Sequence, residues 1–162
     1  MKKTSSGVFF FLSLLFYLIQ LIVVGYELIT PFKLVAHDAL TWDQFVWLSF
    51  VEHSLFLEPL LIIPGIIGLL KRDVQGFTLA LIYPYFLLTF GIMTLLNYQS
   101  PIGYYQMPMF LFSFILISLI NLNAYNDGIN KSKAFLLNLK SLGLALVLFF
   151  LISEMIKNQM VL

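Results

Sequence analysis

Five long apolar stretches determine what this chain can fold into. An α-helix needs about 20 such residues to cross a hydrocarbon core of roughly 30 Å. A membrane-spanning segment must also satisfy its own backbone hydrogen bonds, and these stretches lack the alternating pattern of barrel strands. We therefore predict five transmembrane helices, at residues 8–29, 45–70, 77–97, 104–122 and 135–156.

The composition points to the same class. Hydrophobic residues make up 60% of the chain and charged residues only 10%, and the mean hydropathy of +0.96 excludes a water-soluble fold. The connections at 71–76, 98–103 and 123–134 are too short to hold a soluble domain. Residues 1–162 are thus predicted to form a single all-α domain, a five-helix bundle of a polytopic integral membrane protein.

Basic residues divide unequally between the two ends of the predicted helices. Because cytoplasmic loops carry the excess of Lys and Arg, we expect the N-terminus in the cytoplasm and the C-terminus outside. The cations lie in separate short loops, which predicts no nucleic-acid partner. One end holds Lys2, Lys3, Lys71, Arg72, Lys131, Lys133 and Lys140, and the other holds Lys33 and Lys157.

The sequence offers no signature of a metal or a cofactor. It has no cysteine, and His37 and His53 with scattered carboxylates make no recognised ligand spacing. No glycine-rich phosphate loop or serine elbow is present. The usage of Lys, Asn, Ile and Phe favours an AT-rich genome, and we take a bacterial plasma membrane as the default location.

Glu58 is the strongest candidate for a functional residue, because it interrupts the apolar run 45–70 near its middle. A carboxylate at this depth costs a few kcal/mol, so such residues face a protein interior or a wet cavity. Counting depth along antiparallel helices gives two polar layers, which together describe a funnel open to the outside or, alternatively, polar groups that hold helices together. The inner layer is Gln20, Glu58, Tyr85, Thr89 and Ser113, and the outer layer is Glu27, Glu52, His53, Thr94, Asn97, Gln106 and Glu154. For Gln20, Thr89 and Ser113 we favour the helix-packing interpretation.

Three prolines, Pro59, Pro64 and Pro84, are predicted to kink their helices. Each lacks an N–H and frees the carbonyl four residues before it, so acceptors become available near Glu58 and near Tyr83 and Tyr85 for a ligand or for water. The freed carbonyls are those of Leu55, Leu60 and Ala80.

Two glycines, Gly65 and Gly68, lie in the second apolar stretch. Small residues let helix backbones approach closely, although this spacing is not that of a GxxxG dimer motif. We expect a close helix contact here.

The segment from Glu52 to Glu58 contains the groups capable of acid–base chemistry. On a straight helix Glu52 and Glu58 diverge by about 120°, and His53 and Glu58 by about 140°, so a kink or a wide pocket would be required to bring them together. Burial favours the neutral carboxyl, which makes Glu58 a candidate proton donor or a partner for a buried amine. The alternative is that Glu52 and His53 are solvated near the interface and that only Glu58 is buried.

Several segments resemble the EXPERA superfamily, which contains emopamil-binding protein and the sigma-2 receptor. The stretch from Ser49 to Pro59 is similar to that family's second helix, and Leu81-Ile82-Tyr83 follows at a family-like interval. The segment from Pro108 to Leu116 resembles a later, proline-bearing helix, and Glu27 falls where the family has an acid that closes the first helix. The resemblance covers roughly residues 15–122.

This resemblance implies a small membrane protein that handles sterols. It implies that Glu27 and Glu52 line a ligand cavity, with one acid meeting an amine or a sterol hydroxyl. Isomerases of the family move a double bond with an intramembrane His and Glu pair one helical turn apart. Here His53 and Glu58 are five residues apart, so binding is expected ahead of catalysis.

Our leading hypothesis is an intramembrane pocket that binds or moves a hydrophobic small molecule, either a lipid or a sterol-like compound. The second hypothesis is an isomerase-like enzyme with Glu52, His53 and Glu58 as catalytic residues. The third is a structural or accessory subunit that pairs with a membrane-protein partner or with a second copy of the chain. The residues predicted to bind the ligand are Glu27, Glu52, Glu58, Tyr83, Tyr85 and Asn97.

Overall fold

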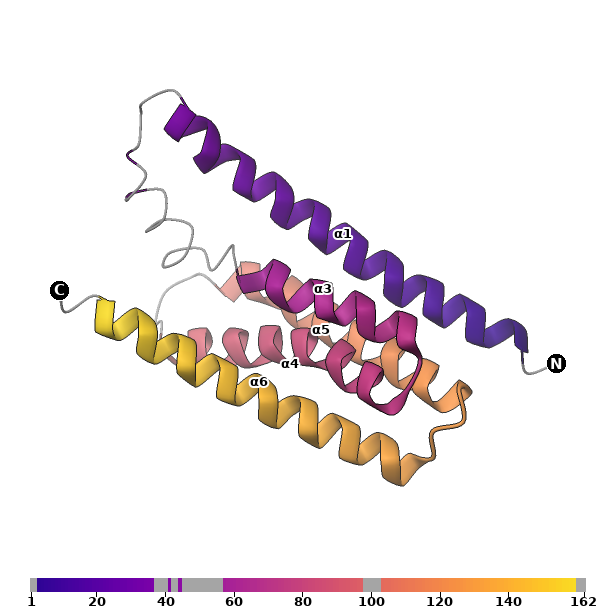
Figure 1. The fold of residues 1–162 in the computed structure, drawn as a ribbon. Coiled ribbons are helices and arrows are strands. Elements are labelled where there is room, and N and C mark those ends of the chain that lie inside the picture. Colours follow the sequence, from indigo (N-terminus) through magenta and orange to yellow (C-terminus); the bar gives the residue numbers. More distant parts are fainter. Residues whose placement is uncertain (1–2, 37–40, 42–43, 45–56, 98–102, 160–162) are drawn as a thin grey trace.

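All the regular secondary structure in the described part of the chain is helical. The structure is a computed structural model that describes residues 3–36, 41, 44, 57–97 and 103–159, and within these ranges it contains five helices and no strand (Figure 1). The all-α prediction is therefore confirmed. The helices are α1 (Lys3–Ala36), α3 (Leu57–Lys71), α4 (Val74–Asn97), α5 (Gly103–Asn126) and α6 (Lys131–Gln159).

Four of these helices are long and apolar enough to cross a membrane. Each contains one of the predicted apolar stretches, and α3 covers the second half of the remaining one, whose first half lies outside the described residues. The candidate spans are Gly7–Tyr26, Val74–Ile92, Met109–Asn126 and Lys131–Glu154.

The helices extend beyond the predicted apolar stretches because polar residues cap them. The carboxylate of Asp73 accepts a hydrogen bond of 2.6 Å from the backbone N–H of Gly76 at the start of α4. The side-chain oxygen of Asn130 accepts one of 2.9 Å from the N–H of Lys133 at the start of α6. Such caps satisfy N–H groups that have no partner within the helix.

Helix α4 is the centre of the bundle. It packs against α3, α5 and α6, whereas α1 packs mainly against α3 and α5 on the side opposite α6 (Figure 1). More than half of its candidate span, Val74–Ile92, is buried, compared with about a sixth of the spans of α1 and α6. Side chains on α4 can therefore contact several other helices.

A close backbone contact joins α3 to α4. A Cβ atom added to Gly68 would overlap the backbone carbonyl oxygen of Gly76, and one added to Gly76 would overlap that of Gly68. The expected close approach at Gly68 is thus confirmed. Arg72 follows the end of α3 with a φ of 52°, the left-handed conformation that commonly ends a helix, and the chain turns directly into α4.

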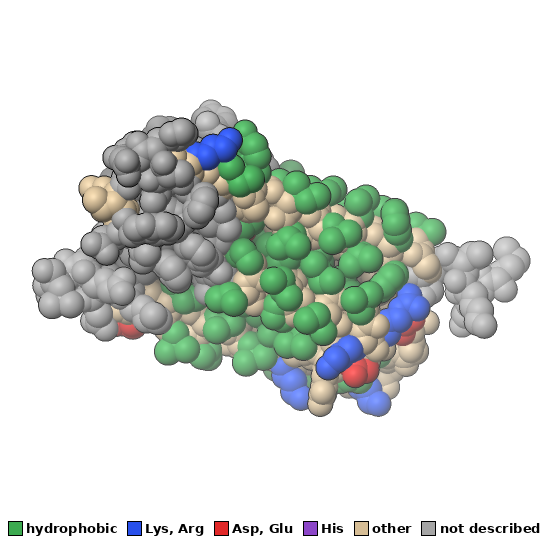
Figure 2. Space-filling view, turned by 45° about the horizontal axis from the view of Figure 1, so that its top comes forward, with side chains coloured by type: hydrophobic (Ala, Val, Ile, Leu, Met, Phe, Trp, Pro, Cys, Tyr) green, Lys and Arg blue, Asp and Glu red, His purple; other side chains and the backbone are tan. Residues whose placement is uncertain are grey.

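The surface is apolar along the helices and charged at one end. Hydrophobic side chains cover much of the visible face, and most of its Lys and Arg side chains gather at one end (Figure 2). The start of α1, the α3–α4 turn and the α5–α6 turn share that end because successive helices alternate in direction (Figure 1).

Candidate functional site

Glu58 lies where three helices meet. Its carboxylate oxygen Oε2 accepts a hydrogen bond of 3.4 Å from the side-chain amide of Gln20 on α1. The same oxygen accepts one of 3.3 Å from the hydroxyl of Tyr83 on α4. Glu58 itself is half-buried in the first turn of α3. The structure therefore brings together three residues that the sequence marked: Gln20 and Glu58 from the inner polar layer, and Tyr83 from the ligand-binding set.

Tyr17 on α1 packs against Tyr83 and Gly65 next to this junction. It is fully buried, its ring centroid lies 5.8 Å from that of Tyr83, and its ring occupies the space that a side chain at Gly65 would fill. Its hydroxyl donates a hydrogen bond to the backbone carbonyl of Ala80. That carbonyl is the acceptor freed by Pro84, which has no N–H to donate. The acceptor that we expected to be available for a ligand is thus occupied by Tyr17.

Tyr17 and Gln20 belong to a stripe of residues along one face of α1. Ser13, Tyr17, Gln20 and Val24 are spaced by four, three and four residues, which places them on one side of the helix. Ser13 accepts a hydrogen bond of 2.9 Å from the amide of Asn123 on α5. The three polar members therefore contact three different helices: Ser13 contacts α5, Tyr17 contacts α4 and Gln20 contacts α3. Ser13 and Tyr17 were not among the residues predicted from the sequence, although this spacing could have revealed them.

The hydrogen bond between Ser13 and Asn123 stabilises the packing of α1 less than the bond from Tyr17 to Ala80 does. Both residues are buried, but the side-chain oxygen of Asn123 accepts no hydrogen bond from the described residues. An unpaired buried acceptor offsets much of the gain from a hydrogen bond. Tyr17, whose only side-chain polar atom is paired, is the stronger attachment of α1.

Tyr85 belongs to a separate polar cluster on another side of α4. Its hydroxyl donates a hydrogen bond of 2.6 Å to the side-chain oxygen of Asn138 on α6. Asn138 also exchanges hydrogen bonds of 2.7 and 3.0 Å with the amide of Asn121 on α5. Tyr85 was predicted to lie at the depth of Glu58 and to bind the same ligand, whereas in the structure it joins α4, α5 and α6 together with Asn121 and Asn138.

The other predicted residues fall into three groups. Thr89 and Ser113 are buried, and their hydroxyls bond to carbonyls of their own helices, at Tyr85 and Met109 respectively. Glu154 is exposed on α6. Six candidates lie outside the described residues or have side chains that do, and Thr94 on α4 and Gln106 on α5 are two of them. Glu52 and His53 fall between α1 and α3, and the side chains of Glu27 and Asn97 fall near the ends of α1 and α4. Among the described residues, no group of His, Asp and Glu is arranged to hold a metal ion.

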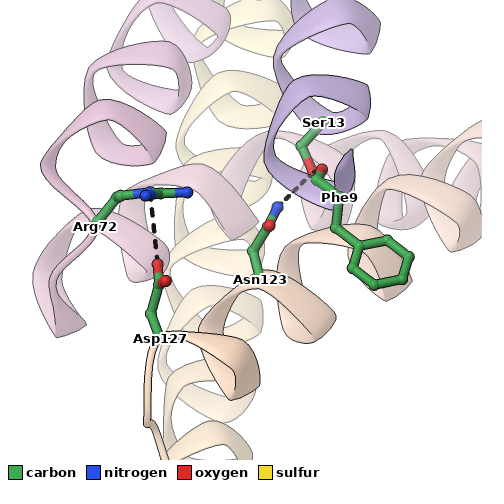
Figure 3. A network of polar contacts seen from close by, with 5 residues as sticks. All are labelled: Phe9, Ser13, Arg72, Asn123 and Asp127. Atoms are coloured by element: carbon green, nitrogen blue, oxygen red, sulfur yellow. Dashed lines mark hydrogen bonds and ion pairs between the residues drawn. The ribbon is translucent and has the colours of Figure 1, made fainter. Parts of the chain in front are cut away.

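A second junction lies at the charged end of the bundle, and Figure 3 shows it. Arg72 reaches from the α3–α4 turn to Asp127, with Nε 3.6 Å from a carboxylate oxygen. Its guanidinium also lies over the ring of Phe10 on α1, 4.5 Å from the centroid, a cation–π geometry. Arg72 thus contacts α1 and the residue after α5 from a turn between two other helices.

Comparison of the chain with models of protein families, with curated proteins and with solved structures found no match. The resemblance to the EXPERA superfamily stays a prediction from the sequence segments that carry it.

Proposed function

We propose that the chain is a polytopic membrane protein in which Glu58 binds the polar group of a hydrophobic small molecule. Five helices, with α3 and α4 kinked at their prolines, form the bundle in this proposal. Four of the described helices are apolar enough to span a bilayer, and the exposed side chains along them are predominantly hydrophobic (Figure 2). Such a surface suits lipid better than water.

The observation that carries the proposal is the setting of Glu58. Its partner Tyr83 lies at the middle of the span Val74–Ile92, and its partner Gln20 lies within the span Gly7–Tyr26. In a bilayer crossed by these spans, the carboxylate lies inside the apolar layer, where an ionisable group is costly and is usually functional. The hydrogen bonds from Gln20 and Tyr83, at 3.4 and 3.3 Å, are longer than the common 2.9–3.0 Å. An ammonium or hydroxyl group of a ligand would form a shorter and stronger contact with this carboxylate.

The ligand class follows from the surroundings. A molecule that reaches Glu58 from the bilayer must be mostly apolar, with one donor group, which describes a lipid or a sterol-like amphiphile. In this proposal Glu27, Glu52 and Asn97 line the same site, as the EXPERA resemblance implies for the two acids. The isomerase alternative requires Glu52 and His53 to reach the ligand together with Glu58.

A second candidate function is that of a structural or accessory subunit. The contacts of Glu58 with Gln20 and Tyr83 favour it, because interhelical hydrogen bonds of this kind hold membrane helices together. The two candidates differ in what removal of the charge on Glu58 changes: ligand affinity in the first, and only stability in the second.

Glu58→Gln separates these candidates. For the protein in lipid nanodiscs at neutral pH, we expect the variant to bind N,N-dimethyldodecylamine about tenfold more weakly, the loss typical of a hydrogen bond to a charged group. Wild-type affinity should fall as the pH is lowered and Glu58 takes up a proton, whereas the variant should show no such fall. Dodecanol has the same alkyl chain and no charge. Its affinity should fall less between the wild type and Glu58→Gln than the affinity for the amine does. Calorimetric titration of the nanodiscs with both probes measures this.

Glu154→Gln is the matched control, because Glu154 is an exposed carboxylate on α6. It should bind both probes as the wild type does. If Glu58→Gln lowers the unfolding temperature but leaves amine affinity and its pH profile unchanged, Glu58 is a packing residue and the accessory-subunit candidate replaces the binding site.

The proposed orientation can be mapped directly because the chain has no cysteine. With the N-terminus in the cytoplasm, Lys33→Cys should react with a membrane-impermeant maleimide in intact bacterial cells. Lys71→Cys should react only after permeabilisation, because Lys71 lies at the opposite end of the helices. Labelling of both variants in intact cells would contradict a membrane-spanning bundle, and the reverse pattern would invert the orientation.

A further inference from the structure

The guanidinium of Arg72 lies level with the ends of several candidate membrane spans. It stacks on Phe10, which is in the first turn of the candidate span Gly7–Tyr26. It faces Asp127, the residue directly after the span Met109–Asn126, and Arg72 itself comes two residues before the span Val74–Ile92. Three apolar spans therefore begin or end at the level of this one side chain. In a bilayer crossed by these spans, as proposed above, this level is the membrane–water interface, where lipid phosphates lie.

Arg72 also retains donors for another partner. Its contact with Asp127 runs through Nε at 3.6 Å, beyond the length of a good hydrogen bond, and no hydrogen bond joins its guanidinium to the described residues. The side chain is 42% exposed. Guanidinium groups offer five N–H donors in a fork that matches a phosphate, so the outer edge of this group is available.

Further cations surround the same end of the bundle. Lys71, Lys131 and Lys133 are exposed beside the two turns, where Asp73 and Asp127 are the described acids. Lys140 is exposed on α6, and its neighbour Ser141 bonds to the carbonyl of Thr78 in the second turn of α4. Judged by this bond, Lys140 is about four residues, roughly 6 Å, deeper than the α3–α4 turn. Its long side chain can extend from there toward the interface.

Exposed apolar side chains lie close in sequence to Arg72 and Phe10. Leu70, two residues before Arg72, and Phe11, next to Phe10, are 60% and 62% exposed. A phospholipid with its phosphate on Arg72 would have its acyl chains against side chains of this kind. A soluble phosphate would gain nothing from them.

We propose that this basic end binds the headgroups of anionic phospholipids, with Arg72 holding a lipid phosphate at the junction of α1, α3, α4 and α5 and Lys140 holding one on the α6 side. This site lies at the far end of the helices from the Lys33 end and does not depend on a ligand at Glu58.

The test measures which lipids remain on the protein. Wild-type protein is taken from nanodiscs with equal amounts of phosphatidylglycerol and phosphatidylcholine, and the retained lipids are counted by native mass spectrometry. We expect phosphatidylglycerol to be retained preferentially, with Arg72→Gln reducing the preference about fivefold, as for the loss of one surface cation. Lys33→Gln, at the opposite end, should leave the preference unchanged. Equal retention of both lipids by the wild type, or an unchanged preference in Arg72→Gln, would overturn the proposal.

Two further arms make the result decisive. Lys140→Gln alters an exposed side chain, so this variant should fold even if Arg72→Gln does not. It should reduce the preference for phosphatidylglycerol. An unchanged preference in this variant would mean that Lys140 does not belong to the site. Glycerol phosphate added before measurement should not displace the lipid, whereas displacement would identify a site for soluble phosphates instead. No amine ligand enters these measurements, so failure here and failure at Glu58 are distinguishable.

Discussion

Gly68→Ala and Gly76→Ala should each destabilise the protein more than any other change of one methyl group in the described helices. Each added Cβ would overlap the backbone carbonyl oxygen of the other glycine, and two backbones cannot move aside as a flexible side chain can. Helices α3 and α4 would have to separate along a buried interface. We expect a loss of about 3 kcal/mol, the upper part of the usual range for overpacking, seen as a lower unfolding temperature in detergent.

Gly143→Ala is the control for this experiment. Gly143 lies in α6, and no atom comes within 4 Å of a Cβ built there. Alanine is a better helix former than glycine by about 1 kcal/mol, so this variant should be as stable as the wild type or more stable. If all three variants unfold at the same temperature, α3 and α4 do not make the close contact described.

Tyr17→Phe should destabilise the bundle although it removes a single oxygen atom. The carbonyl of Ala80 lost its helical partner to Pro84 and accepts its hydrogen bond from Tyr17 instead. Without the hydroxyl, a buried acceptor remains unpaired, at a cost of about 1–3 kcal/mol. Tyr17→Ala should cost about 3–5 kcal/mol, because it also leaves a cavity beside Gly65 and Tyr83. Thermal unfolding of the purified proteins should give the highest unfolding temperature for the wild type, a lower one for Tyr17→Phe and the lowest for Tyr17→Ala.

Tyr26→Phe is the matched control because Tyr26 lies on the same helix and is 72% exposed. This variant should unfold at the same temperature as the wild type. Equal unfolding temperatures for Tyr17→Phe and Tyr26→Phe would mean that the Ala80 carbonyl has another donor and that Tyr17 does not hold α1 to α4 by this bond.

The helices could be predicted from the sequence because hydropathy and length report directly on them. Their ends were less predictable: the apolar stretch began at residue 135, whereas α6 begins at Lys131 after the Asn130 cap, and the predicted end at 122 fell one turn short of Asn126. Hydropathy detects the apolar part of a helix, while hydrogen bonding at its ends sets where it begins and stops.

The candidate site was predictable in part. Glu58 stood out because charge is rare in an apolar run, and depth counting placed Gln20 at its level. Tyr17 did not stand out, since a tyrosine fits an apolar stretch and its acceptor, the Ala80 carbonyl, is a backbone atom. Tyr83 and Tyr85 looked equivalent in sequence, but two residues along a helix differ by about 200° in direction. That rotation sends one to Glu58 and the other to Asn138.

The polar stripe of α1 also sets an order of assembly. For a chain that enters a bilayer from its N-terminus, α1 arrives before any of its partners. Gln20 then lacks its partner Glu58 until α3 is inserted, and Tyr17 lacks the Ala80 carbonyl until α4 is inserted. The hydroxyl of Ser13 donates to the Phe9 carbonyl within α1 and gains its second contact, with Asn123, when α5 arrives. Each new helix satisfies one more group on α1, in the reverse of their order along the helix. In such a chain α1 serves as a template for the later helices, and the arrival of α5 completes its set of partners.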